Sequence, residues 1–257
     1  MAQLRAQLAG QLAGQVDRRF AQRRSAESGL RTGAEQEVPT LPTLPALAEL
    51  LPDPGLRRGA SYAVEGSTTL ALALAAGPSA EGSWCAAVGM PMLGIEAAAE
   101  LGLDLDRLAL VPDPGDRWLS VVATMAEAFD VVLVKPPTRA YDAQSRRLAA
   151  RFRERGTVLL VLGSWPGCEA RLAVTGSRWH GLGNGHGRLT AREAMVTVSG
   201  RRSAARPRTA TLWLPDPVGG VRLADPGATD SGPGAADSGA GAAGETAAPS
   251  LTALAAG

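Results

Sequence analysis

Short apolar runs alternate with helix-period segments through the middle of the chain. The runs are rich in Val, Leu and Ala, which is typical of strands buried on both faces of a sheet. They are Tyr62–Val64, Trp84–Val88, Leu108–Val111, Val131–Val134 and Thr157–Leu162. Strands that alternate regularly with helices predict an α/β fold, in which a mostly parallel sheet is covered by helices.

Helices are expected between these runs, where apolar residues recur at helical spacing. The expected helices are the segment that opens on Thr69 and residues 94–102, 116–129 and 141–155, with a short helical turn at 44–51. Beyond Trp165 apolar and polar residues alternate. Antiparallel edge strands are therefore predicted near the C-terminus, at Ala194–Val198 and Thr209–Leu214.

Both ends of the chain differ from this core. Residues 1–28 repeat apolar side chains at every fourth position, which predicts an amphipathic helix. Its stripe is Leu4, Leu8, Leu12, Val16 and Phe20. Residues 29–43 are polar and then punctuated by proline, as in linkers. The expected core spans residues 44–223, and the Gly, Ala, Ser, Asp and Pro of residues 224–257 predict disorder.

Three roles fit the apolar stripe of the N-terminal helix. The helix could fold back on its own core, dock on another subunit or a partner protein, or lie on a membrane surface. The stripe lacks Trp and is rich in small residues, which disfavours the membrane. The first two roles stay open, and the stripe is the candidate partner-binding surface.

Composition narrows the choice of compartment and ligand. The net charge is +1, so no global field attracts nucleic acid. Lys135 is the one lysine among 26 basic residues, which indicates a GC-rich coding bias first and chemistry second. Cys85 and Cys168 both lie in apolar, strand-like contexts typical of reduced thiols. With no long apolar window and no secretory signal, a cytoplasmic location is expected, with the nucleoid as an alternative.

The segment around residues 58–77 has the layout of a phosphate-binding loop, in which a strand feeds a tight turn and the turn feeds a helix N-terminus. The turn keeps the small residues that end such a loop, Gly66, Ser67, Thr68 and Thr69. It has neither the loop lysine nor the first glycine, and it is shorter than the motif. Glu65 also places negative charge where a phosphate would bind.

The strand Val131–Val134 ends in Lys135, where a nucleotide hydrolase would carry an acidic residue for Mg²⁺. A cation there would repel the metal ion. The end of the strand at Val88 likewise offers no carboxylate to activate water. We therefore expect no ATPase activity, no enzyme function, no cofactor and no metal.

Two roles remain possible for each of two arginine clusters and one glycine-rich segment. Arg146, Arg147 and Arg151 lie on one expected helix, and Arg201 and Arg202 follow later. They fit solvated faces, or a patch that neutralises DNA phosphates. The segment Gly181–Gly187 is expected to be a mobile surface loop, with nucleic-acid contact as the alternative.

Several motifs together resemble the core of RecA-type recombinases. They are LPALAELLPDPGLRRGASYAVEGSTTLALALAAG, EGSWCAAV, AAAELGLDLDRLALVPDP and EAFDVVLVKPP, which lie between residues 44 and 162. Among RecA-like proteins, the missing lysine and the replaced acid are similar to the ImuA type. The resemblance implies a RecA-like core and a non-catalytic adaptor in damage-induced translesion synthesis.

The same resemblance implies partners. These are an inactive Y-family polymerase homologue (ImuB-like) and an error-prone C-family polymerase, with DNA and a homo-oligomer as further candidates. In filament-forming recombinases an N-terminal helix packs on the neighbouring protomer, and the stripe from Leu4 to Phe20 is a counterpart. Two other functions stay open: a SulA-like inhibitor of cell division, and a RecA-like ATPase with an atypical loop.

Overall fold

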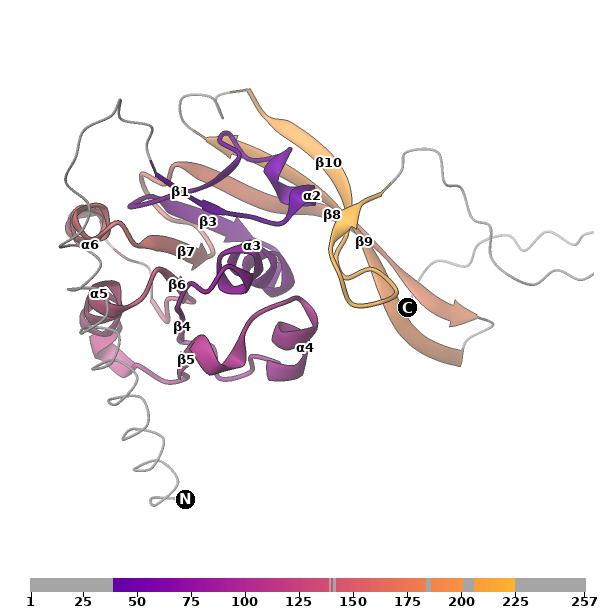
Figure 1. Ribbon diagram of the computed structural model, residues 1–257, viewed down its shortest axis with the longest axis horizontal. Coiled ribbons are helices and arrows are strands. Elements are labelled where there is room, and N and C mark those ends of the chain that lie inside the picture. Colours follow the sequence, from indigo (N-terminus) through magenta and orange to yellow (C-terminus); the bar gives the residue numbers. More distant parts are fainter. Residues whose placement is uncertain (1–38, 139, 141, 184–185, 201–205, 225–257) are drawn as a thin grey trace, which may run out of the picture. The chain divides into compact units, whose positions relative to one another are not determined.

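The computed structural model describes residues 39–224, except 139, 141, 184–185 and 201–205 (Figure 1). All of them fall within the first of two compact units, Met1–Pro226. The expected N-terminal helix with its stripe, most of the expected linker, Arg201, Arg202 and the expected tail beyond Ala224 lie outside the described residues.

A nine-stranded sheet, in the order β11-β10-β9-β8-β3-β7-β6-β4-β5, forms the centre of this unit. Strands β3 to β7 are parallel to one another, and β8 joins them by pairing parallel with β3. Strands β8 to β11 are antiparallel. The strands are β3 (Ser61–Glu65), β4 (Cys85–Val88), β5 (Leu108–Val111), β6 (Val131–Val134), β7 (Val158–Leu162), β8 (Ala170–Gly183), β9 (His186–Gly200), β10 (Arg208–Trp213) and β11 (Arg222–Leu223). The predicted α/β class, with antiparallel strands near the C-terminus, is confirmed.

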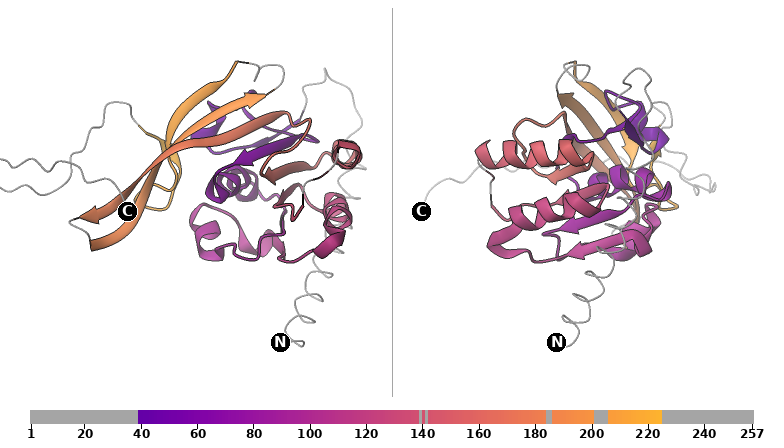
Figure 2. Two further views of the ribbon diagram at one scale, coloured as in Figure 1. Left: turned by 180° about the vertical axis from the view of Figure 1, so that it is seen from behind. Right: turned by 60° about the vertical axis from the view of Figure 1, so that its left-hand side comes forward.

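Helices cover both faces of the parallel strands (Figure 2). One face packs on α2, α3 and α4, and the other packs on α5 and α6. Their bounds are α2 (Pro45–Ala48), α3 (Thr68–Ala80), α4 (Ile95–Glu100), α5 (Trp118–Ala128) and α6 (Asp142–Arg155), with single 3₁₀ turns at Leu105–Arg107 and Gly115–Arg117. The strand and helix pattern expected from hydrophobic periodicity is therefore present through residue 162.

Helix α3 is the most deeply buried helix, because its sequence TTLALALAAGPSA is apolar on every side. All residues from Leu70 to Ser79 are buried. The helix packs between the sheet and the segment that contains β1, and Gly77 lies against the backbone of Thr43. This burial fixes the position of the helix N-terminus, which follows directly on β3.

Two parts of the fold differ from the sequence expectation. Thr40–Pro42, inside the expected linker, forms strand β1, and it pairs antiparallel with β2 (Gly55–Arg57). The expected glycine-rich loop is wrong for Gly181–Gly183, which end β8, and for His186 and Gly187, which begin β9. Backbone pairing between two long strands, Leu182 with Gly187 and Gly183 with His186, overrides the loose local composition.

The two cysteines also differ from each other. Cys85 lies buried in β4, as expected, but Cys168 is half-buried in the turn before β8 and lies in no strand. No disulfide joins them. In the described part of the chain, no helix has both the length and the apolar content that a membrane crossing requires.

Tyr62 makes stability sensitive to alkaline pH. Burial raises the pKa of its hydroxyl to about 12, and the Glu169 carboxylate adds to the rise, although the backbone N–H of Arg57, which donates to this hydroxyl at 2.8 Å, lowers it. An unfolded tyrosine ionises near pH 10, so ionisation favours the unfolded chain between about pH 10 and 12. The free energy of unfolding is expected to fall there, by up to about 1.4 kcal/mol per pH unit for this group.

The measurement is urea unfolding from pH 8 to 11 with the wild type and Tyr62→Phe. Burial raises the pKa of Cys85 to about 12 as well, so the wild type carries both contributions. The variant should be less stable at neutral pH, because the Arg57 N–H loses its acceptor, and its stability should fall less steeply above pH 10. Equal slopes for the two proteins would contradict the assignment.

Candidate functional site

The candidate site lies at the edge of the sheet where the parallel strands β3, β4, β6 and β7 end. Ligands of open α/β sheets bind outside these carboxyl ends, and phosphates bind where a strand passes into a helix. Here β3 ends at Glu65 and α3 begins at Thr68, so only Gly66 and Ser67 connect them. A turn of this length is too short to wrap a chain of phosphates in backbone N–H groups.

The turn is closed by the chain itself. Gly66 has a φ of +80°, and a Cβ at this position would lie 3.2 Å from the carbonyl oxygen of Val174 on β8. Ser67 is the N-cap of α3, and its Oγ accepts a hydrogen bond from the N–H of Leu70 at 3.1 Å. The helix therefore begins at Thr68 rather than at the expected Thr69, because serine caps a helix well. One N–H that could have bound an anion is already satisfied.

Two arginines from the antiparallel strands reach this turn. The Glu65 carboxylate is 3.4 Å from the Nε of Arg171 on β8, so its charge is paired. The Nη1 of Arg192 on β9 donates to the Ser67 Oγ at 3.5 Å. Its guanidinium also stacks on Trp179, with Cζ 5.5 Å from the ring centroid. The expected negative charge at Glu65 is present, and a cation lies beside the turn, supplied by β9 rather than by a loop lysine.

Lys135 directly follows β6 and is exposed. The backbone N–H of Lys135 donates to the Val88 carbonyl at 3.0 Å. The Lys135 carbonyl oxygen lies so close to Gly89 that a Cβ at that position would overlap it. Strand β7 separates β6 from β3 in the sheet, so Lys135 and the turn are two strand spacings, about 10 Å, apart. The structure thus places a cation at the end of the strand where a hydrolase needs a carboxylate.

The other titratable groups near this edge form pairs rather than a ligand set. His180 Nε2 is 3.4 Å from the Glu193 carboxylate, and the His180 ring lies 4.9 Å from the ring of Trp213. Among the residues that the structure describes, no three His, Cys, Asp or Glu side chains gather in a way that could hold a metal ion.

The arginine cluster on α6 divides into two kinds. Arg151 is bound to Glu127 of α5, with its Nε and Nη2 both 2.7 Å from the same carboxylate oxygen, and Arg155 binds the other oxygen. Arg146 and Arg147 are exposed, and within the described residues neither makes an ion pair. Arg153 is exposed as well, so the helix keeps solvated cations, whereas Arg151 and Arg155 join α6 to Glu127 of α5.

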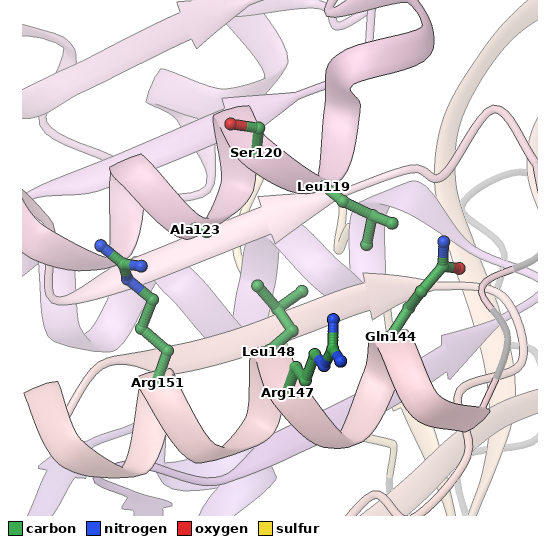
Figure 3. A pocket seen from close by; sticks show the side chains of 7 residues that line it. All are labelled: Leu119, Ser120, Ala123, Gln144, Arg147, Leu148 and Arg151. Atoms are coloured by element: carbon green, nitrogen blue, oxygen red, sulfur yellow. The ribbon is translucent and has the colours of Figure 1, made fainter.

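A groove between α5 and α6 was not expected from the sequence. It has a volume of about 280 Å³, and Leu119 and Leu148 point into the gap between the two helices (Figure 3). The rest of its lining is Ser120, Ala123, Gln144, Arg147 and Arg151. It lies on the helical layer and not at the strand ends, so it is separate from the turn between β3 and α3.

Sequence reasoning also missed Arg171 and Arg192, which reach the turn, and Trp179, on which Arg192 stacks. A usable signal was present in β8, where Ala170, Leu172 and Val174 alternate with Arg171, Ala173 and Thr175. The glycines that follow obscured this period-two pattern. No local signal, however, indicates that Arg192 meets Ser67, because the two residues are 125 positions apart.

Comparisons with known proteins cover the parallel part of the fold. Residues 49–167 match the family model described as MT3502 N-terminal domain. The match thus runs from the end of α2 to the turn before β8, and it leaves out the antiparallel strands. The chain is also similar to "Uncharacterized protein Rv3395c" of Mycobacterium tuberculosis, with 41% identity over 113 residues. This alignment covers 43% of the chain and spans 55% of the relative's length.

Proposed function

We propose that this protein is a non-catalytic adaptor of the ImuA type, which acts in damage-induced translesion synthesis by binding other proteins. The observation that carries the proposal is the two-residue turn between β3 and α3. Its hydroxyl caps the helix and receives Arg192, and its neighbouring carboxylate is paired with Arg171. A phosphate-binding loop needs these groups unoccupied and pointing at a ligand.

Lys135 gives a second, independent support. A nucleotide hydrolase neutralises the developing charge with Mg²⁺ held by an acidic residue at the end of this strand. An exposed ammonium group at the same place works against metal binding. Two separate parts of the catalytic machinery are thus replaced, while the sheet and its covering helices are kept.

The partners follow from the resemblance to the ImuA type. They are an inactive Y-family polymerase homologue and an error-prone C-family polymerase. The N-terminal stripe from Leu4 to Phe20 is the docking surface in this proposal, with DNA contact by the exposed arginines of α6 as a further contribution. The similarity to the MT3502 N-terminal domain and to the mycobacterial relative adds no activity, since neither name specifies one.

Deletion of residues 1–28 tests the docking part of the proposal. Pull-down of the Y-family homologue is expected to be lost, because the apolar stripe goes with the deleted segment, while circular dichroism and thermal unfolding should show an intact core. A matched full-length variant, Leu8→Asp with Leu12→Asp, should behave like the deletion, because it places charges on the stripe. Retained pull-down by both variants would contradict the role of this segment.

Isothermal titration with ATP and Mg²⁺ tests the non-catalytic part. No heat of binding and no phosphate release are expected from the purified chain. Micromolar binding that Arg192→Ala abolishes would favour the atypical ATPase instead, because the arginine would then replace the loop lysine.

A further inference from the structure

The outer half of the β8–β9 hairpin is a two-stranded ribbon with a free aromatic face. Pairing of β8 with β3 ends at Ala173, and pairing of β9 with β10 ends at Glu193. Beyond these residues the two strands pair with each other, and both views show them extending past the parallel strands (Figures 1 and 2). This ribbon lies outside the 49–167 region that matches the family model.

Trp179 is the main feature of the ribbon. Half of the residue, 50%, is exposed, which is unusual for so large an aromatic residue. Arg192, its cross-strand partner, stacks on the ring with its Cζ 5.5 Å from the centroid. The same guanidinium bonds Ser67, and its Nε is buried. The indole is therefore held in place by a guanidinium that is itself fixed to α3, and its exposed surface stays open to a ligand.

Charge on the ribbon favours an anionic ligand. Arg188 is exposed, and Arg192 adds a second cation on the face of Trp179, whereas the exposed Arg178 lies on the opposite face, across from Glu193. Glu193 is the one carboxylate on the described residues of this ribbon, and His180 lies 3.4 Å from it. Cations that neutralise phosphates and an aromatic ring on which a base can stack are the two components of single-strand binding surfaces.

We propose that the β8–β9 ribbon binds single-stranded nucleic acid, with one base stacked on Trp179 and the neighbouring backbone phosphate on Arg188. Stacking needs no base-specific hydrogen bonds, so the binding would tolerate any sequence. The site is independent of Arg146 and Arg147 on α6. It adds a nucleic-acid ligand to the adaptor role, and it does not depend on the polymerase partners.

The test uses the purified full-length chain and a fluorescein-labelled oligothymidylate of about 20 nucleotides, followed by fluorescence anisotropy. Trp179→Ala should weaken binding by about 5- to 150-fold, and Trp179→Phe, which keeps a stacking ring, should weaken it much less. Arg188→Ala should lower the slope of log K against log salt by about 0.7 for each phosphate that the protein no longer neutralises. Leu105→Ala, an exposed apolar residue near the opposite sheet edge, is the matched control and should change nothing.

Each outcome decides between alternatives. An oligouridylate of the same length tests RNA against DNA. Equal affinity for the two oligonucleotides would mean that the ribbon binds both kinds of single strand, and a higher affinity for one would identify DNA or RNA as the preferred ligand. No anisotropy change, or equal affinities for Trp179→Ala and the wild type, would overturn the proposal. So would free ATP competing as well as the oligonucleotide, which would indicate a mononucleotide site. If Trp179→Ala spared the oligonucleotide but abolished the pull-down of a protein, the ribbon would be a protein-docking surface. A failed N-terminal docking test leaves all these outcomes unaffected.

Discussion

Replacement of Gly77 by valine is expected to lower the free energy of unfolding by about 3 kcal/mol or more. A Cβ at Gly77 would lie 2.6 Å from the Cα of Thr43 and 2.8 Å from its carbonyl carbon. Both are backbone atoms, so no side-chain rotation relieves the overlap. The segment with β1 would have to move away from α3, and the buried leucines of the helix would lose their cover. Against a typical domain stability of about 5–15 kcal/mol this destabilisation is large.

Urea unfolding followed by circular dichroism measures the effect. Gly94→Ala is the matched control, because Gly94 has a φ of −72° and a Cβ there would meet only the Ala97 Cβ at 3.6 Å. The control should stay within about 0.5 kcal/mol of the wild type. Equal urea midpoints of unfolding for Gly77→Val and Gly94→Ala would contradict the close packing of the Thr43 backbone on α3.

The central strands were predictable because strands that are buried on both faces are continuous apolar runs in the sequence. Leu108–Val111 and Val131–Val134 have the bounds that their apolar runs predict, and α6 begins one residue after its expected start. A charged residue precedes each run, and Pro112 or Lys135 follows it, so no tertiary information is needed to delimit the strand. The antiparallel strands were found only in part, because Ala194–Val198 is only the part of β9 in which buried residues alternate with more exposed ones.

The short strands β1 and β2, which were not expected, have no such apolar run. β1 and β2 have three residues each, and prolines surround them, so their composition is that of a linker. Their existence depends on pairing with each other and on packing against α3, which are long-range effects. The outer part of β8 was missed because it is rich in glycine, which is typical of loops. Gly181 has a φ of +107° and lies at an irregularity in the pairing of β8 with β9.

The site shows the same division between local and long-range information. That the turn lacks a lysine, and that β6 is followed by Lys135 rather than by an acidic residue, can be read directly from the sequence. That Arg192 and Arg171 engage the turn cannot, because both belong to strands whose registers depend on the whole sheet. The structure therefore adds an observation that the sequence could not supply: the Ser67 hydroxyl is bound to Leu70 and Arg192, and the Glu65 carboxylate is paired with Arg171.

The buried carboxylate of Asp130 gives the second large prediction. Its side chain is 7% exposed, one oxygen lies 3.3 Å from the Arg58 guanidinium, and the other accepts the Trp84 N–H at 3.1 Å. It thereby joins the turn before β3, the start of β4 and the start of β6. Asp130→Ala is expected to cost about 3 kcal/mol, because the Trp84 N–H loses its acceptor and Arg58 loses its counter-ion.

Two controls separate these contributions. Arg58 is 31% exposed, so water screens part of its charge, and the orphaned N–H should dominate the destabilisation. Asp130→Asn keeps an oxygen for Trp84 and should cost about 1 kcal/mol, while Asp106→Ala, at an exposed carboxylate, should stay within about 0.5 kcal/mol. A destabilisation by Asp130→Asn as large as that by Asp130→Ala would show that the ion pair, not the hydrogen bond, sets the stability. Because Asp130 and Asp106 both lie outside β8 and β9, all three variants should leave oligonucleotide binding unchanged under conditions where they are folded.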